Sequence, residues 1–261
     1  MTEMNHSLPQ VIILAAGEGS RLRPHTLDRP KCLVEVAGES LLERHLRVLG
    51  AAGLHEINII TGYRGQQLEG RGAKVWTNPR YAETNMVWTL FCADEILNRD
   101  TIVAYGDIVY AAGHIEKLLA TDADVAVVVD RQWEVYWRAR FENPLDDAET
   151  LKVNAAGHIT EIGKKPLSMA DIQAQYIGLM KFSAAGLEKL RQQFQAAQQA
   201  GSMCGKPVEK AYMTDLIQAL IDSGSSVVAV PVDGQWVEVD SVSDMELPIV
   251  AQRLSEICEG L

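Results

Sequence analysis

The sequence predicts an α/β fold built on a mostly parallel sheet, and three observations support this prediction. Apolar segments of strand length alternate along the chain with segments of helical apolar spacing, an order that is typical of helices packed on a parallel sheet. The strand segments 57–61 and 125–129 are almost continuously apolar, as expected for strands buried on both faces. Polar or glycine-containing turns follow several strands, at the sheet edge where ligands bind in such folds.

The first half of the chain supplies the parallel core of the predicted sheet. Its apolar runs predict strands at 11–14, 57–61, 101–105 and 125–129. Apolar residues at helical spacing predict helices at 41–49, 86–97 and 115–119. Helical crossovers of this kind allow the strands that they connect to run in the same direction.

The second half is less regular. We interpret the segment 131–180 as a small lid or insertion within a single domain that covers residues 1–261. It begins with aromatic and basic residues, continues with an acidic turn, and contains short strand candidates at 151–153 and 159–162. The remaining patterns predict helices at 184–199 and 210–222, strands at 226–231 and 236–239, and a final helix at 245–257.

Composition limits the class of protein. A chain of 261 residues, 47% of them hydrophobic, can bury the core of one large domain. The net charge of -11 argues against nucleic-acid and anionic-membrane partners, which need a basic surface. The four cysteines form no Cys-x-x-Cys pair, which disfavours a zinc site or disulfide scaffold and favours the reducing cytoplasm. We find neither a signal peptide nor the roughly 20 apolar residues needed to span a bilayer.

The segment 14–31 carries the most specific motif of the chain. It follows the apolar strand 11–14, and Gly17 and Gly19 allow the backbone to approach a ligand so that successive N–H groups converge on phosphate oxygens. Arg21 offers a planar fork of donors, and Lys31 adds a mobile positive charge. We therefore predict that a nucleoside triphosphate binds to Leu14, Ala15, Ala16, Gly17, Glu18, Gly19, Ser20 and Arg21.

This segment resembles the signature of the nucleotidyltransferases that activate sugar phosphates, phosphocholine and phosphonates. Their pattern, Leu-Ala-Ala-Gly-x-Gly-x-Arg-Leu-x-Pro-x-Thr-x-x-x-Pro-Lys, is matched at every fixed position from Leu14 to Lys31. The segment lacks the Gly-Lys-Ser/Thr ending of a P-loop, and its glycine spacing does not fit a dinucleotide-binding turn. The resemblance implies a Rossmann-like three-layer fold of the GT-A/nucleotidyltransferase type, and nucleotidyl transfer with release of pyrophosphate.

Two aspartates match the metal-binding positions of this family. Asp107 follows the strand 101–105 in a Gly-Asp turn, and Asp240 ends the strand 236–239. Magnesium (Mg2+) is expected here because it is held by one or two carboxylates together with phosphate oxygens and waters. A turn or helix-cap role is the alternative for each aspartate, and Ser241 or Ser243 could cap the final helix and leave Asp240 as flanking charge.

Catalysis of this kind depends on positioning and electrostatics, so Arg21 and Lys31 are the predicted catalytic residues. We expect Arg21 to contact the leaving β- and γ-phosphates and Lys31 to lie between the α-phosphate and the acceptor. Neither a protein nucleophile nor a general base is required, because the acceptor phosphate is already ionised. Gly106, beside Asp107, is counted among the nucleotide-binding residues.

The segment 81–90 bears on the choice of base. Its Tyr-Ala-x-x-Asn start resembles phosphocholine and phosphonate cytidylyltransferases, which implies that Asn85 and a hydroxyl residue, Thr89, lie near a cytosine. Asn85 has the donor and acceptor needed to read a pyrimidine, although it could also cap the helix 86–97. Gly62 and Tyr63, after the strand 57–61, are weaker candidates for base contacts. CTP is therefore the expected nucleotide.

The acceptor is expected to be a small phosphorylated molecule that binds at the segment 131–180. Aromatic residues there could enclose the quaternary ammonium of phosphocholine, or could simply pack. The basic residues suit a phosphonate, a phosphoramidate or an amino-acid phosphate such as phosphoglutamine, and the acidic turn 146–149 could bind a substrate ammonium or be solvated. The candidate acceptor-binding residues are Lys31, Trp133, Trp137, Arg138, Arg140, Lys164 and Tyr176.

Two other functions compete with a cytidylyltransferase. A sugar-1-phosphate nucleotidylyltransferase using UTP, dTTP or GTP is one, because the Met-Thr-Asp-Leu at 213–216 resembles a segment of those enzymes. A noncatalytic nucleotide sensor is the other, and the presence of both Asp107 and Asp240 disfavours it. The apolar stripe of the final helix allows a monomer or a homodimer, because it could pack on its own sheet or on a second subunit.

Overall fold

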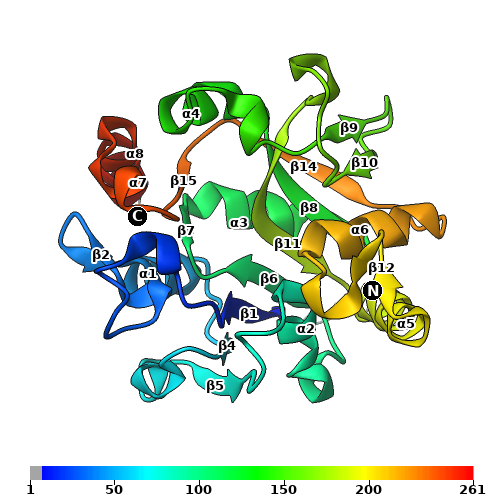
Figure 1. The fold of residues 1–261 in the computed structure, drawn as a ribbon, viewed down its shortest axis with the longest axis horizontal. Coiled ribbons are helices and arrows are strands. Elements are labelled where there is room, and N and C mark those ends of the chain that lie inside the picture. The colour runs from blue at the N-terminus through cyan, green and yellow to red at the C-terminus, as the bar shows by residue number, and fades with distance from the viewer. Residues whose placement is uncertain (1–7, 261) are drawn as a thin grey trace, which may run out of the picture.

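A seven-stranded sheet forms the centre of this computed structural model, which describes residues 8–260 (Figure 1). All neighbouring strands are parallel except where β11 pairs with β6 and β8. The predicted mostly parallel α/β fold is therefore confirmed. In spatial order the strands are β14 (Val228–Val232), β8 (Val125–Asp130), β11 (Gln175–Phe182), β6 (Thr101–Tyr105), β1 (Gln10–Ala15), β4 (Ile57–Thr61) and β5 (Lys74–Thr77).

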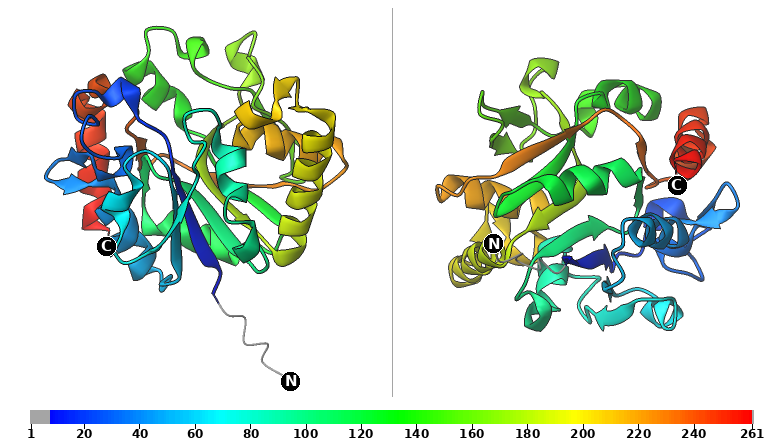
Figure 2. Two further views of the ribbon diagram at one scale, coloured as in Figure 1. Left: turned by 60° about the horizontal axis from the view of Figure 1, so that its bottom comes forward. Right: turned by 180° about the vertical axis from the view of Figure 1, so that it is seen from behind.

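Helices cover both faces of the sheet and give the fold three layers (Figures 1 and 2). Alternate residues of β1 enter two different cores, Val11 and Ile13 on one face and Ile12 and Leu14 on the other. The first core includes residues of α1, α3 and α8, and the second includes residues of α2, α5 and α6. The helices are α1 (Leu41–Ala51), α2 (Met86–Phe91), α3 (Ala112–Ala120), α4 (Trp133–Arg140), α5 (Ala184–Ala200), α6 (Met213–Asp222), α7 (Val242–Glu246) and α8 (Pro248–Glu259).

Four two-stranded ladders lie outside the main sheet. They pair β2 (Glu35–Val36) with β3 (Glu39–Ser40), β7 (Ile108–Tyr110) with β15 (Trp236–Glu238), β9 (Leu151–Val153) with β10 (Ile159–Ile162), and β12 (Ser202–Met203) with β13 (Lys206–Pro207). The predicted strand candidates at 151–153 and 159–162 thus pair with one another. Within residues 8–260, no helix is long and apolar enough to cross a membrane.

Two predicted helices were too long. Helix α2 ends at Phe91 instead of residue 97, because the chain then changes to the tighter hydrogen bonds of a 3-10 turn at Asp94–Ile96, with Ala93 N–H donating to Leu90 (3.2 Å) and Ile96 N–H to Ala93 (3.0 Å). The predicted final helix is divided into α7 and α8 before Pro248, which lacks the N–H that a continuous helix would need and starts α8. The apolar side of α8 packs on its own sheet.

Strand β11 was not predicted, although it lies in the middle of the sheet. Its apolar run is interrupted by Gly178, where the register shifts between Tyr176 and Met180. Gly178 has a φ of +83°, and a Cβ there would lie 2.7 Å from the Tyr105 ring, so only glycine fits. Because β11 begins at residue 175, the end of the segment predicted as an insertion belongs to the main sheet.

His45 of α1 is a polar residue in the centre of the first core. Its side chain is fully buried and meets the edge of Tyr110, with ring centroids 4.9 Å apart. Neither ring nitrogen has a hydrogen-bond partner among residues 8–260. Burial lowers the pKa of His45 from 6.5 to about 4, so the folded protein holds this imidazole neutral.

We predict that the free energy of unfolding falls as the pH is lowered from 7 to 4. The unfolded chain binds a proton at His45 near pH 6.5, whereas the folded chain binds it only near pH 4. Acidification should therefore lower the free energy of unfolding by about 3 kcal/mol. His45→Leu should flatten this pH dependence in urea titrations. A residual slope is expected because burial also lowers the pKa of His114 to about 4. His55→Gln, at an exposed position, is the control, and an equal effect of both variants would contradict the assignment.

Candidate active site

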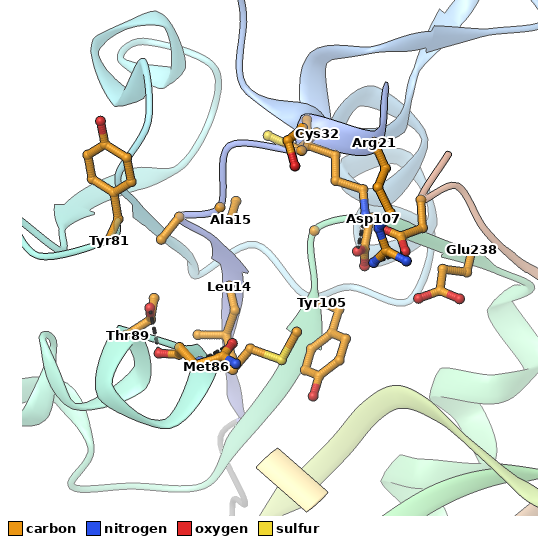
Figure 3. Close-up of a pocket in the computed structure, with 18 of the residues that line it drawn as sticks. Leu14, Ala15, Arg21, Cys32, Tyr81, Met86, Thr89, Tyr105, Asp107 and Glu238 are labelled. Carbon is orange, nitrogen blue, oxygen red and sulfur yellow. Dashed lines mark hydrogen bonds and ion pairs between the residues drawn. The ribbon is translucent and has the colours of Figure 1, made fainter. Parts of the chain in front are cut away.

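A cavity of about 290 Å³ lies where the carboxyl ends of β1 and β6 meet residues 14–31, here called the donor loop. Figure 3 shows Arg21, Asp107 and Glu238 at one end of this donor cavity and Met86 and Thr89 at the other. Thirteen of the predicted site residues line it: Leu14, Ala15, Ala16, Gly17, Gly19, Ser20, Arg21, Lys31, Asn85, Thr89, Gly106, Asp107 and Asp240.

The donor loop folds back on itself at Gly19. This residue has a φ of +62°, and a Cβ there would lie 3.0 Å from the Lys31 Cβ, so glycine permits both the turn and the close passage of the lysine stem. The Thr26 hydroxyl donates to the Gly19 carbonyl at 2.9 Å and holds the return of the loop. Leu22 is fully buried and anchors the loop in the core. The local sequence therefore places Arg21 and Lys31 on the same cavity.

The ladder between β7 and β15 brings Asp240 beside Asp107. Glu238 pairs with Ile108, and the next residue, Val239, donates its N–H to the Asp107 carbonyl at 3.0 Å. The N–H of Asp240 itself is held by Asp244 (2.9 Å), and Ser241 caps α7. Ser241 is thus the helix cap, and the Asp240 carboxylate lines the cavity.

Lys31 lies between the two aspartates. Its Nζ donates to Asp107 Oδ2 and to Asp240 Oδ1, both at 2.6 Å, and Arg21 forms an ion pair with Asp240. The Lys31, Asp107 and Asp240 side chains are only 14%, 16% and 15% exposed, whereas Arg21 is 67% exposed. Burial alone would lower the pKa of Lys31, but the two carboxylates raise it to about 12. The lysine is therefore a fixed positive charge at neutral pH.

Glu238 is a third carboxylate at the cavity that was not predicted. Burial raises its pKa to about 7 against the opposing effect of Arg140, and Asp107 and Asp240 raise it further. The sequence signal was the Val-Glu-Val-Asp alternation, which puts residues 238 and 240 on one side of an extended segment. Arg140 contacts Glu238 at 2.5 Å and Asp244 at 2.9 Å. This arginine, which was predicted to bind the acceptor, therefore lies behind the cavity wall.

The two aspartates have the properties of a site for a divalent cation. The Oδ1 atom of Asp107 is buried and has no hydrogen-bond partner among residues 8–260, so it has unused capacity as a ligand. The described residues contain no cluster of three or more His, Cys, Asp or Glu side chains arranged to hold a metal. Two carboxylates are nevertheless enough for magnesium, which usually keeps phosphate and water ligands. A metal here would compete with the Lys31 ammonium for the carboxylates.

The opposite end of the donor cavity is formed by the start of α2 and the loop before it. Asn85 caps α2 by accepting from the Met86 N–H at 2.9 Å, as the cap alternative expected, and it also lines the cavity. Thr84 and Thr89 line the same end. Asn78, which was not predicted, is fully buried behind them and donates to both hydroxyls at 2.9 Å.

Three predicted nucleotide-binding residues do not line the cavity. Gly62 lies behind Tyr81, and a Cβ there would lie 2.3 Å from the Tyr81 Cβ. The Tyr63 hydroxyl donates to the Leu27 carbonyl at 3.0 Å and supports the donor loop from outside. Glu18 pairs with Arg23 at 3.1 Å. These residues were chosen for their position after a strand or in the motif, which does not determine the direction of a side chain.

A second cavity of about 370 Å³ adjoins the first and is here called the acceptor cavity. The two share five lining residues: Arg21, Met86, Tyr105, Glu238 and Asp240. Tyr105 stands at the junction, edge-on to Tyr176. Two molecules bound in these cavities would therefore meet beside the Arg21 and Asp240 pair.

The family model of the MobA-like NTP transferase domain matches residues 11–158, which is more than half of the chain. The chain belongs to this family. It is 40% identical over 249 residues to a CTP:phosphoglutamine cytidylyltransferase of Campylobacter jejuni, covering 91% of this chain and 98% of that protein. The family confirms the predicted nucleotidyltransferase class of enzyme.

Two solved structures share the fold of this NTP transferase. The CTP:phosphocholine cytidylyltransferase of Streptococcus pneumoniae has a TM-score of 0.69 at 24% identity, over 95% of this chain and 98% of that one. The inositol-1-phosphate CTP transferase of T. maritima has a TM-score of 0.76 at 20% identity, over 97% and 98% of the two chains. The three-layer architecture is thus that of known nucleotidyltransferases.

The acceptor cavity of this NTP transferase differs from the prediction in its charge. Of the six candidate acceptor-binding residues outside the donor loop, only Trp137 and Tyr176 line this cavity. Trp133 packs edge-on to Trp137. Arg138 pairs with Glu134 on the exposed side of α4, and Lys164 pairs with Glu161. Cations were expected to line the acceptor cavity, but its charged lining is Arg21 with four carboxylates: Asp147, Glu149, Glu238 and Asp240.

We predict that Lys31→Met destabilises the fold by roughly 1 to 3 kcal/mol, because Asp107 and Asp240 would then face each other without the central ammonium. Adding Asp240→Asn to this variant should restore part of the loss, since one of the repelling charges is removed. Urea unfolding of the single and double variants without metal measures both effects. Additive losses in the double variant would show that the three charges are not coupled.

Proposed function

We propose that this protein is a magnesium-dependent cytidylyltransferase that transfers CMP from CTP to a small phosphorylated acceptor and releases pyrophosphate. The observation that carries the proposal is the junction of two cavities at a cluster of Lys31, Arg21, Asp107 and Asp240. A nucleotidyltransferase must bring two phosphorylated substrates together, and their repulsion requires positive charge at the meeting point. The 40% identical relative is named for CTP and phosphoglutamine, which supports both halves of the proposal.

The donor cavity would hold the nucleotide with its phosphates toward the charged end and its base near Asn85 and Thr89. The Gly17 to Arg21 turn lines this cavity, so its backbone N–H groups and the Arg21 guanidinium would bind the phosphates. Mg2+ bound by Asp107 and Asp240 would supply further positive charge to the phosphates. Lys31 can then exchange a carboxylate for a phosphate oxygen, because its long side chain already reaches the centre of the cluster.

The reaction needs no protein nucleophile. An oxygen of the acceptor phosphate attacks the α-phosphorus of CTP, the bond to the bridging oxygen of the β-phosphate breaks, and pyrophosphate leaves with that electron pair. Lys31, with its raised pKa, keeps its charge throughout and offsets the charge on both substrates. Arg21 is exposed and free to follow the β- and γ-phosphates. The chain therefore contributes position and charge to the step.

The acceptor is inferred to carry a cationic nitrogen in addition to its phosphate. Asp147 and Glu149 lie on the wall of the acceptor cavity, with aromatic rings of Trp137, Tyr176 and Tyr212 nearby. Burial raises the pKa of Glu149, and a bound ammonium would act in the opposite direction and favour the carboxylate. An amino-acid phosphate such as phosphoglutamine suits this lining, as do phosphocholine and 2-aminoethylphosphonate. A neutral sugar would bring no positive charge to Asp147 and Glu149.

A pyrophosphate-release screen with magnesium tests the proposal. CTP, UTP, dTTP and GTP are each combined with phosphoglutamine, phosphocholine, 2-aminoethylphosphonate and glucose 1-phosphate. We expect turnover with CTP and a nitrogen-bearing acceptor, phosphoglutamine foremost. Turnover with UTP and glucose 1-phosphate, and none with CTP, would contradict the proposal and favour a sugar-phosphate enzyme.

In the same assay, Glu149→Gln should raise the KM for the nitrogen-bearing acceptor about tenfold and leave the KM for CTP nearly unchanged, because one charge-assisted contact is lost. Glu142→Gln removes a carboxylate from an exposed position close by and serves as the matched control. An unchanged KM in the Glu149 variant would remove this residue from the acceptor site.

A further inference from the structure

At the base end of the donor cavity, one backbone contact determines which groups of a hydrogen-bond network donate and which accept. Its centre is Asn78, which is fully buried after β5 and does not itself line the cavity. The Asn78 Oδ1 accepts from the Arg80 N–H at 2.9 Å. Because a backbone N–H can only donate, this contact fixes the orientation of the Asn78 amide, with its NH2 group turned away from Arg80.

That NH2 group determines what the neighbouring hydroxyls can do. It donates to Thr84 Oγ1 and to Thr89 Oγ1, each at 2.9 Å. Each hydroxyl must therefore use its own hydrogen elsewhere, and each has a backbone carbonyl in reach: Thr84 donates to Arg80 (2.8 Å) and Thr89 donates to Asn85 (3.1 Å). A hydroxyl has one hydrogen and two lone pairs, so each oxygen keeps one lone pair and no hydrogen for a ligand.

Asn85, unlike the two hydroxyls, offers a hydrogen-bond donor. Its Oδ1 accepts from the Met86 N–H at 2.9 Å, which fixes the orientation of the amide and leaves its Nδ2 group as a donor. Thr84, Asn85 and Thr89 all line the donor cavity. This end of the cavity therefore offers acceptors at two hydroxyl oxygens and a donor at one amide.

We propose that Asn78 is a positioning residue that makes the site select CTP over UTP, an inference that rests on the proposed cytidylyltransferase function. Cytosine carries an exocyclic amino group, a donor, where uracil carries a carbonyl oxygen, an acceptor. The cytosine amino group can donate to a threonine lone pair, and its ring carbonyl can accept from Asn85. The uracil oxygen could pair only with a hydroxyl that gave up its bond to the backbone carbonyl, so UTP binds at the cost of one hydrogen bond that CTP retains.

The test is calorimetric binding of CTP and of UTP, each with magnesium and without an acceptor. We expect the wild-type protein to bind CTP about tenfold more tightly or better, a size typical of one mismatched buried polar contact. Thr89→Val removes the lone pair and should bring the two affinities closer by a factor of about five or more, whereas Thr89→Ser should retain the preference.

Asn78→Leu releases both hydroxyls and should also reduce the preference, mainly by improving UTP. Asn58→Leu is its matched control, because Asn58 is a buried asparagine on β4 that bonds Gln10 and Trp76 away from the donor cavity. An unchanged ratio in Thr89→Val, or equal losses of preference in the Asn78 and Asn58 variants, would overturn the inference. If Asn78→Leu fails to fold, the Thr89 pair decides. A wild-type protein without preference for CTP would instead overturn the proposed function.

Discussion

The site depends on one buried ammonium held between two carboxylates. Asp107 and Asp240 lie 133 positions apart in the chain, and they can lie side by side only because Lys31 neutralises the repulsion between them. Three parts of the fold supply the three groups: the donor loop, the turn after β6 and the end of β15. The β7 and β15 ladder holds the aspartates in register, and Gly19 allows the lysine stem to reach them. The cluster thus joins the N-terminal and C-terminal parts of the chain.

In the proposed function, the same cluster serves two anionic substrates. Its charges lie at the junction of the donor and acceptor cavities, so each substrate can approach from its own side and meet the other there. Arg21 is mostly exposed and can move with a phosphate, whereas Lys31 is nearly buried and can exchange partners only at the centre of the cluster. The two cavities differ in character beyond the junction. Hydroxyl and amide groups line the base end of one, and carboxylates and aromatic rings line the other.

The fold class, the donor loop and both aspartates could be predicted because each depends on short-range sequence. A strand followed by a glycine turn places Gly17, and a carboxylate that ends a strand lies at the sheet edge. The acceptor side could not be predicted in this way, because its side chains respond to distant partners. Arg140 turns toward Asp244, which lies 104 residues later, and leaves the cavity acidic. Asn78 could not be predicted either, because its proposed role depends on the two hydroxyls that it contacts and not on a sequence motif.

We propose that Lys31 acts where the two substrates meet, in addition to holding the nucleotide. Single-turnover transfer of CMP, with CTP and acceptor both saturating, tests this claim most directly in wild-type protein and Lys31→Ala. We expect the rate constant to fall about 100-fold or more while the affinity for CTP changes by only about threefold, because the charge matters most in the transition state. A loss of affinity with an unchanged rate constant would contradict the claim and assign Lys31 to nucleotide binding alone.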